Sequence, residues 1–503
     1  MQNDISPVSH RILFLNTLAF TICFAVWTFN GVMVTYLVNA GVFDWGPVKV
    51  GWLLGIPILT GSVLRLPLGI LTDKYGGKWV FVAVLLSCAV PMLLLPFAKS
   101  FFTFALLSFI FGLAGASFAV GIGFTSVWYP KHWQGRALGI FGAGNAGAAL
   151  TTLFAPTLLN KFTHNGEFIE NWIYLPLIYA GVLIVMAIIF MIFSVNKKPD
   201  TPPRTLKMVL KPLGNIRVWR FGYYYFLVFG CFVAFSQWLV PYFLNVYGTS
   251  LVVAGLFASL FSLPSGVIRA LGGWMSDKMG ARKVMFGVFK WSILLSILLM
   301  VPKMDIITPG KGVISTAEGK VEQVSESSIK VNGNVYNYKP KAKIEEKTDD
   351  PEGLAAFFPV KYNWQEPIVE EGIQVKKKEL LAKGTTLISF QANMWIYVIF
   401  MFAIGIAWGI GKAGVYRFIP DYFPNEVGIV GGMVGVMGGL GGFVCPILFG
   451  YLLDWTGLWT SSWMLVLLIS ATCFFWLQKI VQKIISSQAP EIAEQMDEKN
   501  GNK

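Results

Sequence analysis

Two arginines stand inside long apolar stretches of the sequence. Arg65 and Arg269 each precede an aspartate, Asp73 or Asp277, by eight residues. Eight residues of helix correspond to roughly 12 Å, so neither side chain is expected to reach the end of its apolar run. A guanidinium presents parallel N–H groups that match a planar oxyanion, and the pair therefore predicts an anion-binding site. The alternative is two structural arginines that bind backbone carbonyls.

A third cation is predicted at the same depth. Lys412 precedes Pro420 by eight residues and is flanked by Gly411 and Gly414. Burial and neighbouring positive charges both disfavour a charged ammonium group, which makes Lys412 a candidate proton carrier. The alternative is a lysine that extends to the membrane surface or binds a carbonyl.

Polar and aromatic residues near these cations complete the candidate site. Asn145, in the stretch Gly142–Gly147, is expected to donate to an anion or to bind a neighbouring helix. Phe118, Tyr225 and Phe229 are candidates for its walls, and Tyr225 adds a hydroxyl donor. Ordinary packing is the alternative for these aromatic residues.

The composition excludes a single soluble globular domain. Of 503 residues, 55% are hydrophobic and 13% are charged, whereas soluble chains carry about 25% charged residues. Several apolar runs exceed the roughly 18 residues that span a membrane. The sequence predicts an all-α polytopic membrane protein with twelve transmembrane helices, at about 12–38, 50–71, 79–97, 102–128, 137–160, 173–194, 218–245, 251–275, 285–302, 393–420, 428–452 and 460–483.

An internal repeat divides these helices into two pseudo-symmetric halves of six. Its two copies, offset by 204 residues, are Arg65-x3-Gly69-x3-Asp73-x2-Gly76 and Arg269-x3-Gly273-x3-Asp277-x2-Gly280. The glycines are expected to let helices approach, and the carboxylates to pair with basic residues or a helix N-terminus across the contact between the halves. The repeat therefore predicts a conformational role, with an ordinary turn as the alternative.

Glycines are also dense in two other predicted helices. They include Gly144 and Gly147 in one helix, and Gly438, Gly439 and Gly441 in another. Between membrane helices small residues permit close, sliding contact, so these five are assigned to conformational change.

Charge sets the predicted orientation. The net charge is +13, and lysines and arginines gather in every second loop, which places those loops and both termini in the cytoplasm. No nucleic-acid partner is implied. The five cysteines lie in apolar segments, and their spacing predicts neither a disulfide framework nor a metal site. Without a nucleophile–base pair or phosphate loop, the chain is not expected to be an enzyme or to need a cofactor.

A soluble insertion interrupts the second half. Residues 303–391 contain 13 Lys, no Arg and 13 Asp or Glu, and Ile329–Tyr336 predicts two strands around an Asn-Gly turn. We expect a small β-rich extracytoplasmic domain that serves as a lid or binds an unknown partner. The predicted organisation is an N-terminal half (1–196), a cytoplasmic linker (197–217), helices 7–9 (218–302), the insertion (303–391), helices 10–12 (392–485) and a cytoplasmic tail (486–503).

The motifs together resemble the NarK-type nitrate/nitrite porter family of the major facilitator superfamily. The resemblance rests on Arg65-Leu-Pro-Leu-Gly, Gly144-Asn145-Ala-Gly147, Arg269 and the glycine run at 431–442, and it covers nearly all predicted helices but not the insertion. It implies a carrier in the cytoplasmic membrane whose two arginines hold nitrate or nitrite while the glycine-rich helices bend and slide. It extends to Asn145 and, more loosely, to Tyr225, Phe229 and Phe118.

The resemblance leaves the transport mode open. Lys412 departs from exchanger-like members, which tend to have asparagine at this position, and the insertion is a second departure. Net anion uptake must overcome about 2.3 kcal/mol per charge per 100 mV and therefore needs co-transported cations. We expect proton-coupled nitrate uptake, as in nitrate assimilation. The alternatives are nitrate/nitrite exchange, a carrier for another small anion such as formate, and a sensor that uses the insertion.

Overall fold

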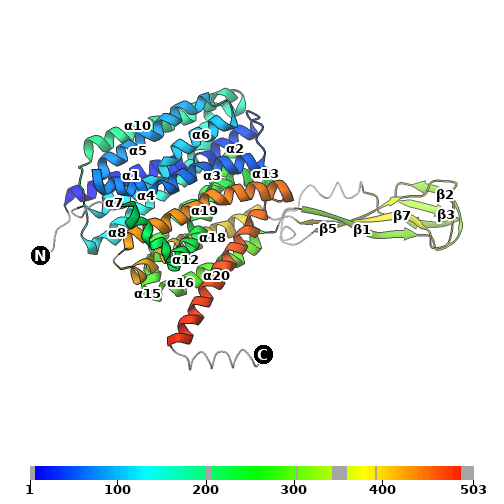
Figure 1. The fold of residues 1–503 in the computed structure, drawn as a ribbon. Coiled ribbons are helices and arrows are strands. Elements are labelled where there is room, and N and C mark those ends of the chain that lie inside the picture. The colour runs from blue at the N-terminus through cyan, green and yellow to red at the C-terminus, as the bar shows by residue number, and fades with distance from the viewer. Residues whose placement is uncertain are drawn as a thin grey trace. The chain divides into compact units, whose positions relative to one another are not determined.

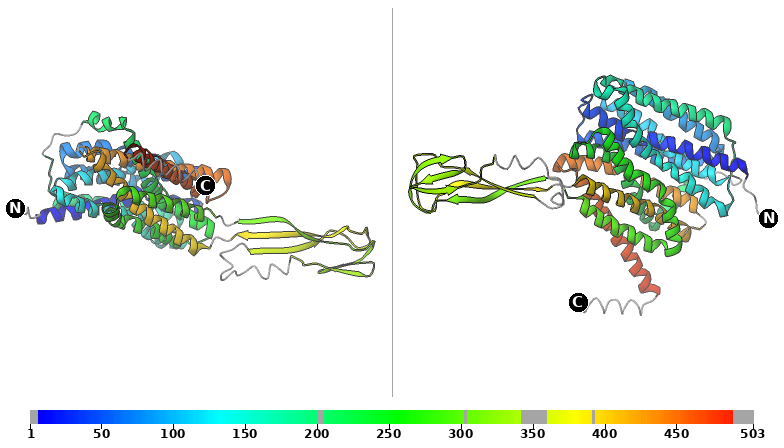
Figure 2. Two further views of the ribbon diagram at one scale, coloured as in Figure 1. Left: turned by 90° about the horizontal axis from the view of Figure 1, so that it is seen from below. Right: turned by 180° about the vertical axis from the view of Figure 1, so that it is seen from behind.

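The computed structural model describes residues 6–199, 205–301, 304–341, 360–390, 393–424 and 426–488. The chain forms two compact units (Figures 1 and 2). One, Met1–Met300 with Ile399–Lys503, consists of helices, and the other, Val301–Val398, consists mainly of strands.

The first part of the helical unit contains ten α-helices and five short 3-10 helices among the residues described. In chain order they are α1 (Pro7–Trp27), α2 (Asn30–Asn39), α3 (Pro47–Val63), α4 (Arg65–Tyr75), α5 (Gly77–Leu94), η1 (Leu95–Phe97), α6 (Phe101–Phe111), η2 (Gly112–Ala116), α7 (Ser117–Ser126), α8 (Lys131–Gly142), η3 (Ala143–Ala146), α9 (Gly147–Phe162), η4 (His164–Gly166), η5 (Ile169–Ile173) and α10 (Tyr174–Phe193).

The second part follows a short linker. Its elements are α11 (Leu206–Leu210), η6 (Lys211–Gly214), α12 (Ile216–Tyr225), the π-helical segment η7 (Phe226–Cys231), α13 (Phe232–Tyr247), α14 (Leu251–Val267), α15 (Arg269–Met279), α16 (Ala281–Leu299), α18 (Met394–Tyr422), α19 (Val427–Thr456) and α20 (Ser461–Gln488).

The described part of the chain has ten helical stretches that are long and apolar enough to cross a membrane. The count is eleven if α14 and α15, which meet at a bend of 44°, form one span. The protein is therefore a multi-pass membrane protein. The predicted span at 285–302 corresponds to α16, which lies outside that count and carries Arg282, Lys283 and Lys290.

Irregular backbone interrupts the helices at the candidate site residues. Arg65 and Arg269 are each the first residue after a break between two helices, at Leu64 and Ile268. Asn145 lies in the 3-10 turn η3, and the π-helical segment η7 follows Tyr225 directly. Irregular backbone at membrane depth is tolerated where it is buried in protein or lines a cavity, and helical defects of this kind are frequent at functional sites.

Glycines allow close helix contacts both within the early helices and between the early and late ones. A side chain at Gly51 of α3 would overlap the Pro446 carbonyl of α19, and one at Gly147 of α9 would overlap the Thr21 carbonyl of α1. Residues from both groups of helices meet, with α3 beside α19 (Figures 1 and 2). The predicted conformational glycines with similarly close neighbours are Gly144, Gly147, Gly438, Gly439 and Gly441.

The repeated motif uses its glycines differently. A Cβ added at Gly69 or Gly273 would have no atom within 4 Å, so in this structure these glycines do not serve close helix approach. Gly76 and Gly280 have φ of 86° and 84°, a conformation that favours glycine, and each ends a helix. The backbone conformation at the helix ends therefore explains why Gly76 and Gly280 are glycines. Close helix approach, which the sequence predicted for the glycines of this motif, does not.

The second unit has two antiparallel sheets. The strands are β1 (Met304–Ile314), β2 (Gly319–Ser325), β3 (Ser328–Val331), β4 (Asn334–Asn337), β5 (Val360–Pro367), β6 (Gln374–Val375) and β7 (Leu380–Phe390), in the orders β1-β7-β5 and β4-β3-β2-β6. Asn332 and Gly333 form the turn between β3 and β4 with positive φ, as the Asn-Gly pattern predicts. Val321, Ile329, Val331 and Val375 form part of its apolar core.

Candidate functional site

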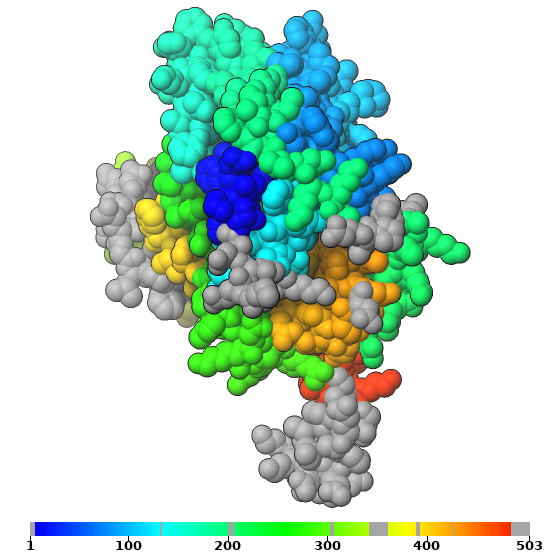
Figure 3. All heavy atoms as spheres, turned by 90° about the vertical axis from the view of Figure 1, so that its left-hand side faces the viewer, coloured from blue at the N-terminus to red at the C-terminus, as the bar shows by residue number. Residues whose placement is uncertain are grey.

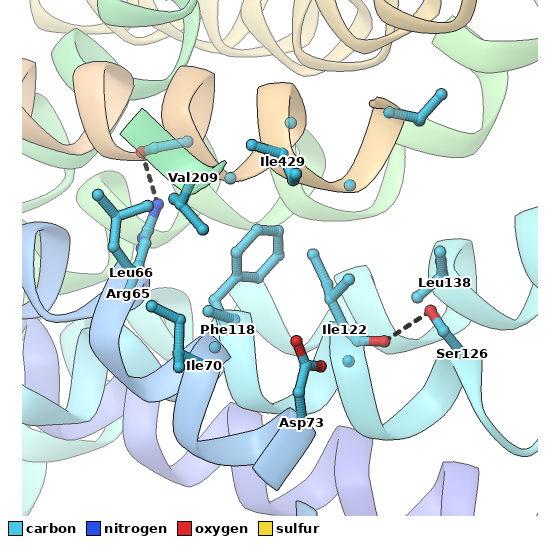
Figure 4. A pocket seen from close by; sticks show the side chains of 18 of the residues that line it. Arg65, Leu66, Ile70, Asp73, Phe118, Ile122, Ser126, Leu138, Val209 and Ile429 are labelled. Carbon is cyan, nitrogen blue, oxygen red and sulfur yellow. Dashed lines mark hydrogen bonds between the residues drawn. The ribbon is translucent and has the colours of Figure 1, made fainter. Parts of the chain in front are cut away.

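A cavity of about 740 Å³ lies between the early and late helices of the helical unit (Figure 4). The cavity reaches the end of this unit that carries Asp73 and Glu426, which we call the aspartate end. Figure 3 shows the unit from the side on which α1 begins. Both arginines of the repeat line the cavity. Its other polar and aromatic lining residues include Asp73, Phe118, Tyr416 and Glu426.

Arg65 is buried and its side chain is held in place. Nη1 donates to the carbonyl oxygen of Gly435 in α19 at 2.7 Å, and Nε to that of Gly115 at 3.4 Å. The guanidinium carbon lies 5.2–5.4 Å from the ring centroids of Trp27, Phe118 and Phe229. Nη2 makes no hydrogen bond to any described residue, so part of the guanidinium fork stays available to a ligand.

Arg269 is half-buried and also lines the cavity. Its guanidinium carbon lies 5.3 Å from the Tyr416 ring centroid, and the Tyr416 hydroxyl donates to the Gly431 carbonyl at 3.0 Å. Arg417 forms ion pairs with Asp277 and Asp421, at 2.7 and 2.6 Å, whereas neither Arg65 nor Arg269 forms an ion pair with a described residue. Two positive charges thus face one cavity without a carboxylate at ion-pair distance among the described residues.

Asp277 pairs within its own group of helices. Its partner Arg417 belongs to α18, whereas the sequence predicted pairing across the contact between the halves as one use of this carboxylate. The difference arises because α15 and α18 end at the same side of the unit, where Arg417 reaches both Asp277 and Asp421. The equivalent residue Asp73 lines the cavity together with residues from the start of α19.

Asn145 is buried but its amide group has no partner. Neither its side-chain nitrogen nor its oxygen finds a hydrogen bond within the described residues. Asn145 is 1% exposed and is not among the residues that line the cavity, and its backbone lies near Gly266 of α14. Buried amides are normally paired, so this orphaned group marks a position that another conformation or a ligand would satisfy.

Of the predicted aromatic residues, Phe118 lines the cavity, whereas Tyr225 and Phe229 pack together but are not among the lining residues. Tyr225 stacks on Phe229 with 4.9 Å between ring centroids, and its ring meets Tyr416 edge-on at 5.0 Å. The Tyr225 hydroxyl is buried without a hydrogen-bond partner of acceptable geometry among the described residues, although Tyr416 lies alongside. In Figure 4 the Phe118 ring lies beside Arg65 in the cavity lining.

Lys412 does not line the cavity. The side chain is fully buried, and Nζ donates to the Ser265 hydroxyl of α14 at 2.9 Å. Nζ also lies 3.1 Å from the ring centroid of Phe232. It neither extends to the surface nor binds a carbonyl, and Arg269 is within electrostatic range. The sequence placed Lys412 in the layer of the arginines, and in the structure its side chain is not among the residues that line the cavity.

Several contacts of the site were not anticipated. Tyr416 lies one helical turn after Lys412, on the same face of α18, and this spacing was a usable signal. Trp27 of α1, which contacts Arg65 and donates to the Pro57 carbonyl at 2.8 Å, carries no such signal because apolar helices are rich in aromatic residues. No group of three potential metal-ligand side chains occurs within the described residues, and the five cysteines are buried and unpaired.

The architecture and the central cavity define the class of a membrane transporter. A family model described as Major Facilitator Superfamily matches residues 15–313 and 380–495. A solved bacterial homolog of the human lysosomal transporter Spinster, in an inward-facing and occupied conformation, has a TM-score of 0.63 at 13% identity, covering 94% of this chain and 97% of that one.

Curated relatives place the chain more narrowly. A probable nitrate/nitrite antiporter, NarK1, of Thermus thermophilus is 34% identical over 493 residues, or 97% of this chain and 95% of that protein. A nitrite extrusion protein of Bacillus subtilis is 24% identical, covering 90% of each chain. The chain belongs to the NarK-type nitrate/nitrite porter family of the Major Facilitator Superfamily.

Proposed function

We propose that this protein carries nitrate or nitrite across the cytoplasmic membrane by alternating access. The single observation that carries the proposal is that Arg65 and Arg269 line one cavity, and neither forms an ion pair among the described residues. The relatives named for nitrate and nitrite support the choice of anion. A small planar oxyanion would supply the negative charge that the two guanidinium groups lack.

The two arginines act differently in this mechanism. Arg65 is fixed by two carbonyls and three aromatic rings, so it provides a preorganised half of the site. Arg269 has the Tyr416 ring beside its guanidinium, which donates no hydrogen bond to a described residue, and it approaches when the helices close. Without an anion the repulsion between two cations opposes this approach, and a bound anion removes it. The helices therefore close only when the transported anion is bound.

Asn145 and Tyr225 supply further donors to the anion. Each has a buried polar group without a partner of acceptable geometry, and such a group costs roughly 1–3 kcal/mol. Pairing with an anion during closure would recover this energy. Phe118 and Phe229 exclude water around the guanidinium of Arg65, which strengthens its attraction for the anion.

The proposed topology has twelve membrane helices, with both termini in the cytoplasm and residues 303–391 outside it. The described spans and α16 together account for twelve crossings if α14 and α15 count as one. The basic residues Lys278, Arg282 and Lys283 at the aspartate end favour a cytoplasmic location for that end. With the aspartate end in the cytoplasm, the cavity opens toward the cytoplasm.

The transport mode is proposed to be nitrate uptake with proton coupling through Lys412. An ammonium group that is fully buried, with a serine and an aromatic ring as its neighbours, would release its proton when an additional positive charge approaches. Arg269 is positioned to provide that charge. Nitrate/nitrite exchange is the second candidate, favoured by the name of the Thermus relative as an antiporter.

Counterflow in proteoliposomes tests the carrier function. Vesicles with purified protein and internal nitrite should accumulate labelled external nitrate, and formate should not replace nitrite. Arg136→Lys, at an exposed arginine of α8 beside Trp133, is a control for the general effects of substitution. If labelled nitrate accumulated equally in protein-free vesicles, or if formate drove the same counterflow, the proposed function would be wrong.

A further inference from the structure

A second group of cations lies away from the cavity, at the ends of α12, α16 and α18. It consists of Arg217, Arg220 and Arg282, which surround the side chain of Tyr422. None of the four residues lines the transport cavity. We call this group the arginine cluster.

Two of the guanidinium groups contact Tyr422, and the third lies over the neighbouring ring of Phe221. The guanidinium carbon of Arg217 lies 5.1 Å from the Tyr422 ring centroid, and Nη2 of Arg282 donates to the Tyr422 hydroxyl at 2.9 Å. Arg220 lies over Phe221 at 5.1 Å, and Phe221 packs against Tyr422 with 5.6 Å between ring centroids. Sequence positions 217, 220 and 282 are therefore brought together by the fold.

The cluster has no acidic counterpart in the part of the chain that the structure describes. The nearby carboxylates Asp277 and Asp421 are both bound by Arg417. Arg220 is 6% exposed, and its Nε is buried without a hydrogen-bond acceptor among the described residues. A buried guanidinium donor left unsatisfied, with two more arginines in electrostatic range, points to an anion that neutralises the group.

Tyr422 is oriented to join in binding such an anion. Because its oxygen accepts from Arg282, the hydroxyl proton is directed elsewhere and can be donated to a ligand. The buried Tyr224 hydroxyl, which has no hydrogen-bond partner among the described residues, is a second donor within electrostatic range of Arg220. Several N–H and O–H donors around one point suit the oxygens of a phosphate group, which are arranged tetrahedrally around phosphorus and share its negative charge.

The surroundings of the cluster are apolar and exposed. Ile216 is 66% exposed and Trp219 is 51% exposed, and both belong to the same helix as Arg217 and Arg220. A tryptophan beside arginines at the end of a membrane helix is typical of the level at which lipid headgroups lie. Basic pockets between membrane helices on the cytoplasmic side bind anionic headgroups.

We propose that the arginine cluster is a phosphate-binding site that holds the headgroup of an anionic phospholipid. The shared chemistry is a phosphate oxyanion, and a soluble phosphate is the other source of it. The proposal is independent of the transported substrate, because none of its residues lines the cavity.

Lipid titration of the purified full-length protein tests the proposal by native mass spectrometry. Phosphatidylglycerol should bind the wild-type protein at least about ten-fold more tightly than it binds the double variant R217Q/R282Q. Phosphatidylcholine should show no such preference. The double variant K278Q/K283Q removes the same charge from exposed lysines at the end of α15 and the start of α16, and should retain phosphatidylglycerol.

A second variant and a second ligand complete the test. Y422F keeps all three charges and removes one donor, and should weaken phosphatidylglycerol binding by about five-fold. If inorganic phosphate alone raises the melting temperature of the wild type but not of R217Q/R282Q, the site is supported with soluble phosphate as its ligand. Equal phosphatidylglycerol binding by the wild type, R217Q/R282Q and Y422F, without a phosphate effect, would overturn the proposal.

Discussion

Arg65 of α4 and Gly435 of α19 are 370 positions apart and are joined by a hydrogen bond of 2.7 Å from Nη1 to the carbonyl oxygen. This bond links a cavity arginine of the early helices to the glycine-rich helix of the late ones (Figure 4). Gly435 has no side chain between its backbone and the guanidinium of Arg65, and an added Cβ would lie 3.5 Å from Nη1. Movement of α19 past α4 must therefore change the donors that Arg65 offers to an anion.

Replacement of either cavity arginine by lysine should weaken nitrate binding. Lysine keeps the charge but loses the planar fork, and we expect affinity to fall by about ten- to a hundred-fold for Arg65→Lys or Arg269→Lys. Calorimetric titration of the purified variants with nitrate measures this, with Arg136→Lys as the matched control. Wild-type affinity in both cavity variants would contradict the assignment of these residues.

Asn145→Ala should lower the affinity for nitrate without lowering the thermal stability of the protein. The asparagine amide has no hydrogen bond to lose among the described residues, so the melting temperature should stay within a few degrees of the wild type, while nitrate affinity falls by about five-fold or more. Nitrate titration and thermal unfolding of the same sample measure both quantities. A large drop in melting temperature with unchanged affinity would assign Asn145 to helix packing instead.

Gly51→Ala should disturb the contact between α3 and α19. The new methyl group would overlap the Pro446 carbonyl oxygen, and we expect a loss of about 1–3 kcal/mol in unfolding free energy. Gly181→Ala in α10 is the control, because no atom lies within 4 Å of its added Cβ. Thermal unfolding in detergent should rank the control above Gly51→Ala, and the reverse order would show that the contact is not tight.

Lys412→Asn should abolish proton movement and leave exchange intact. The substitution removes the buried titratable group while Ser265 keeps a polar neighbour. Nitrate-driven alkalinisation outside proteoliposomes should disappear, whereas nitrate/nitrite counterflow should continue. Lys290→Asn, at an exposed lysine of α16, is the matched control. Unchanged proton movement in Lys412→Asn would refute the proposed role of this lysine and favour the exchanger.

Deletion of residues 304–390 should preserve transport. Met304 and Phe390 are paired across β1 and β7, so their Cα atoms are separated by only about 5 Å and a short glycine–serine linker can close the gap. Counterflow by the shortened protein should remain close to that of the wild type. Loss of counterflow in a variant with an unchanged melting temperature would instead make the insertion part of the transport cycle.

Sequence reasoning was most successful for features that are local. Apolar runs and the spacing within the repeat indicated the helices on which Arg65 and Arg269 lie, because hydrophobic length and helical rise determine both.

Contacts between distant segments could not be predicted in the same way. Nothing near Arg65 in the sequence indicates that Gly115 and Gly435 present carbonyl oxygens to it, because every residue has a carbonyl. Depth along a helix placed Lys412 level with the arginines, but it did not determine the direction of the side chain, which points to Ser265 and Phe232. The pairing of Arg417 with Asp277 likewise depends on how α15 and α18 end together.

The most direct test of the central claim is an experimental structure of the wild-type protein in lipid nanodiscs with nitrate. We predict density for one planar anion within hydrogen-bond distance of both Arg65 and Arg269, with the helices closer together at the aspartate end than in this structure. An anion bound elsewhere, or two guanidinium groups that point apart or pair with acidic residues of the protein, would contradict the proposed function.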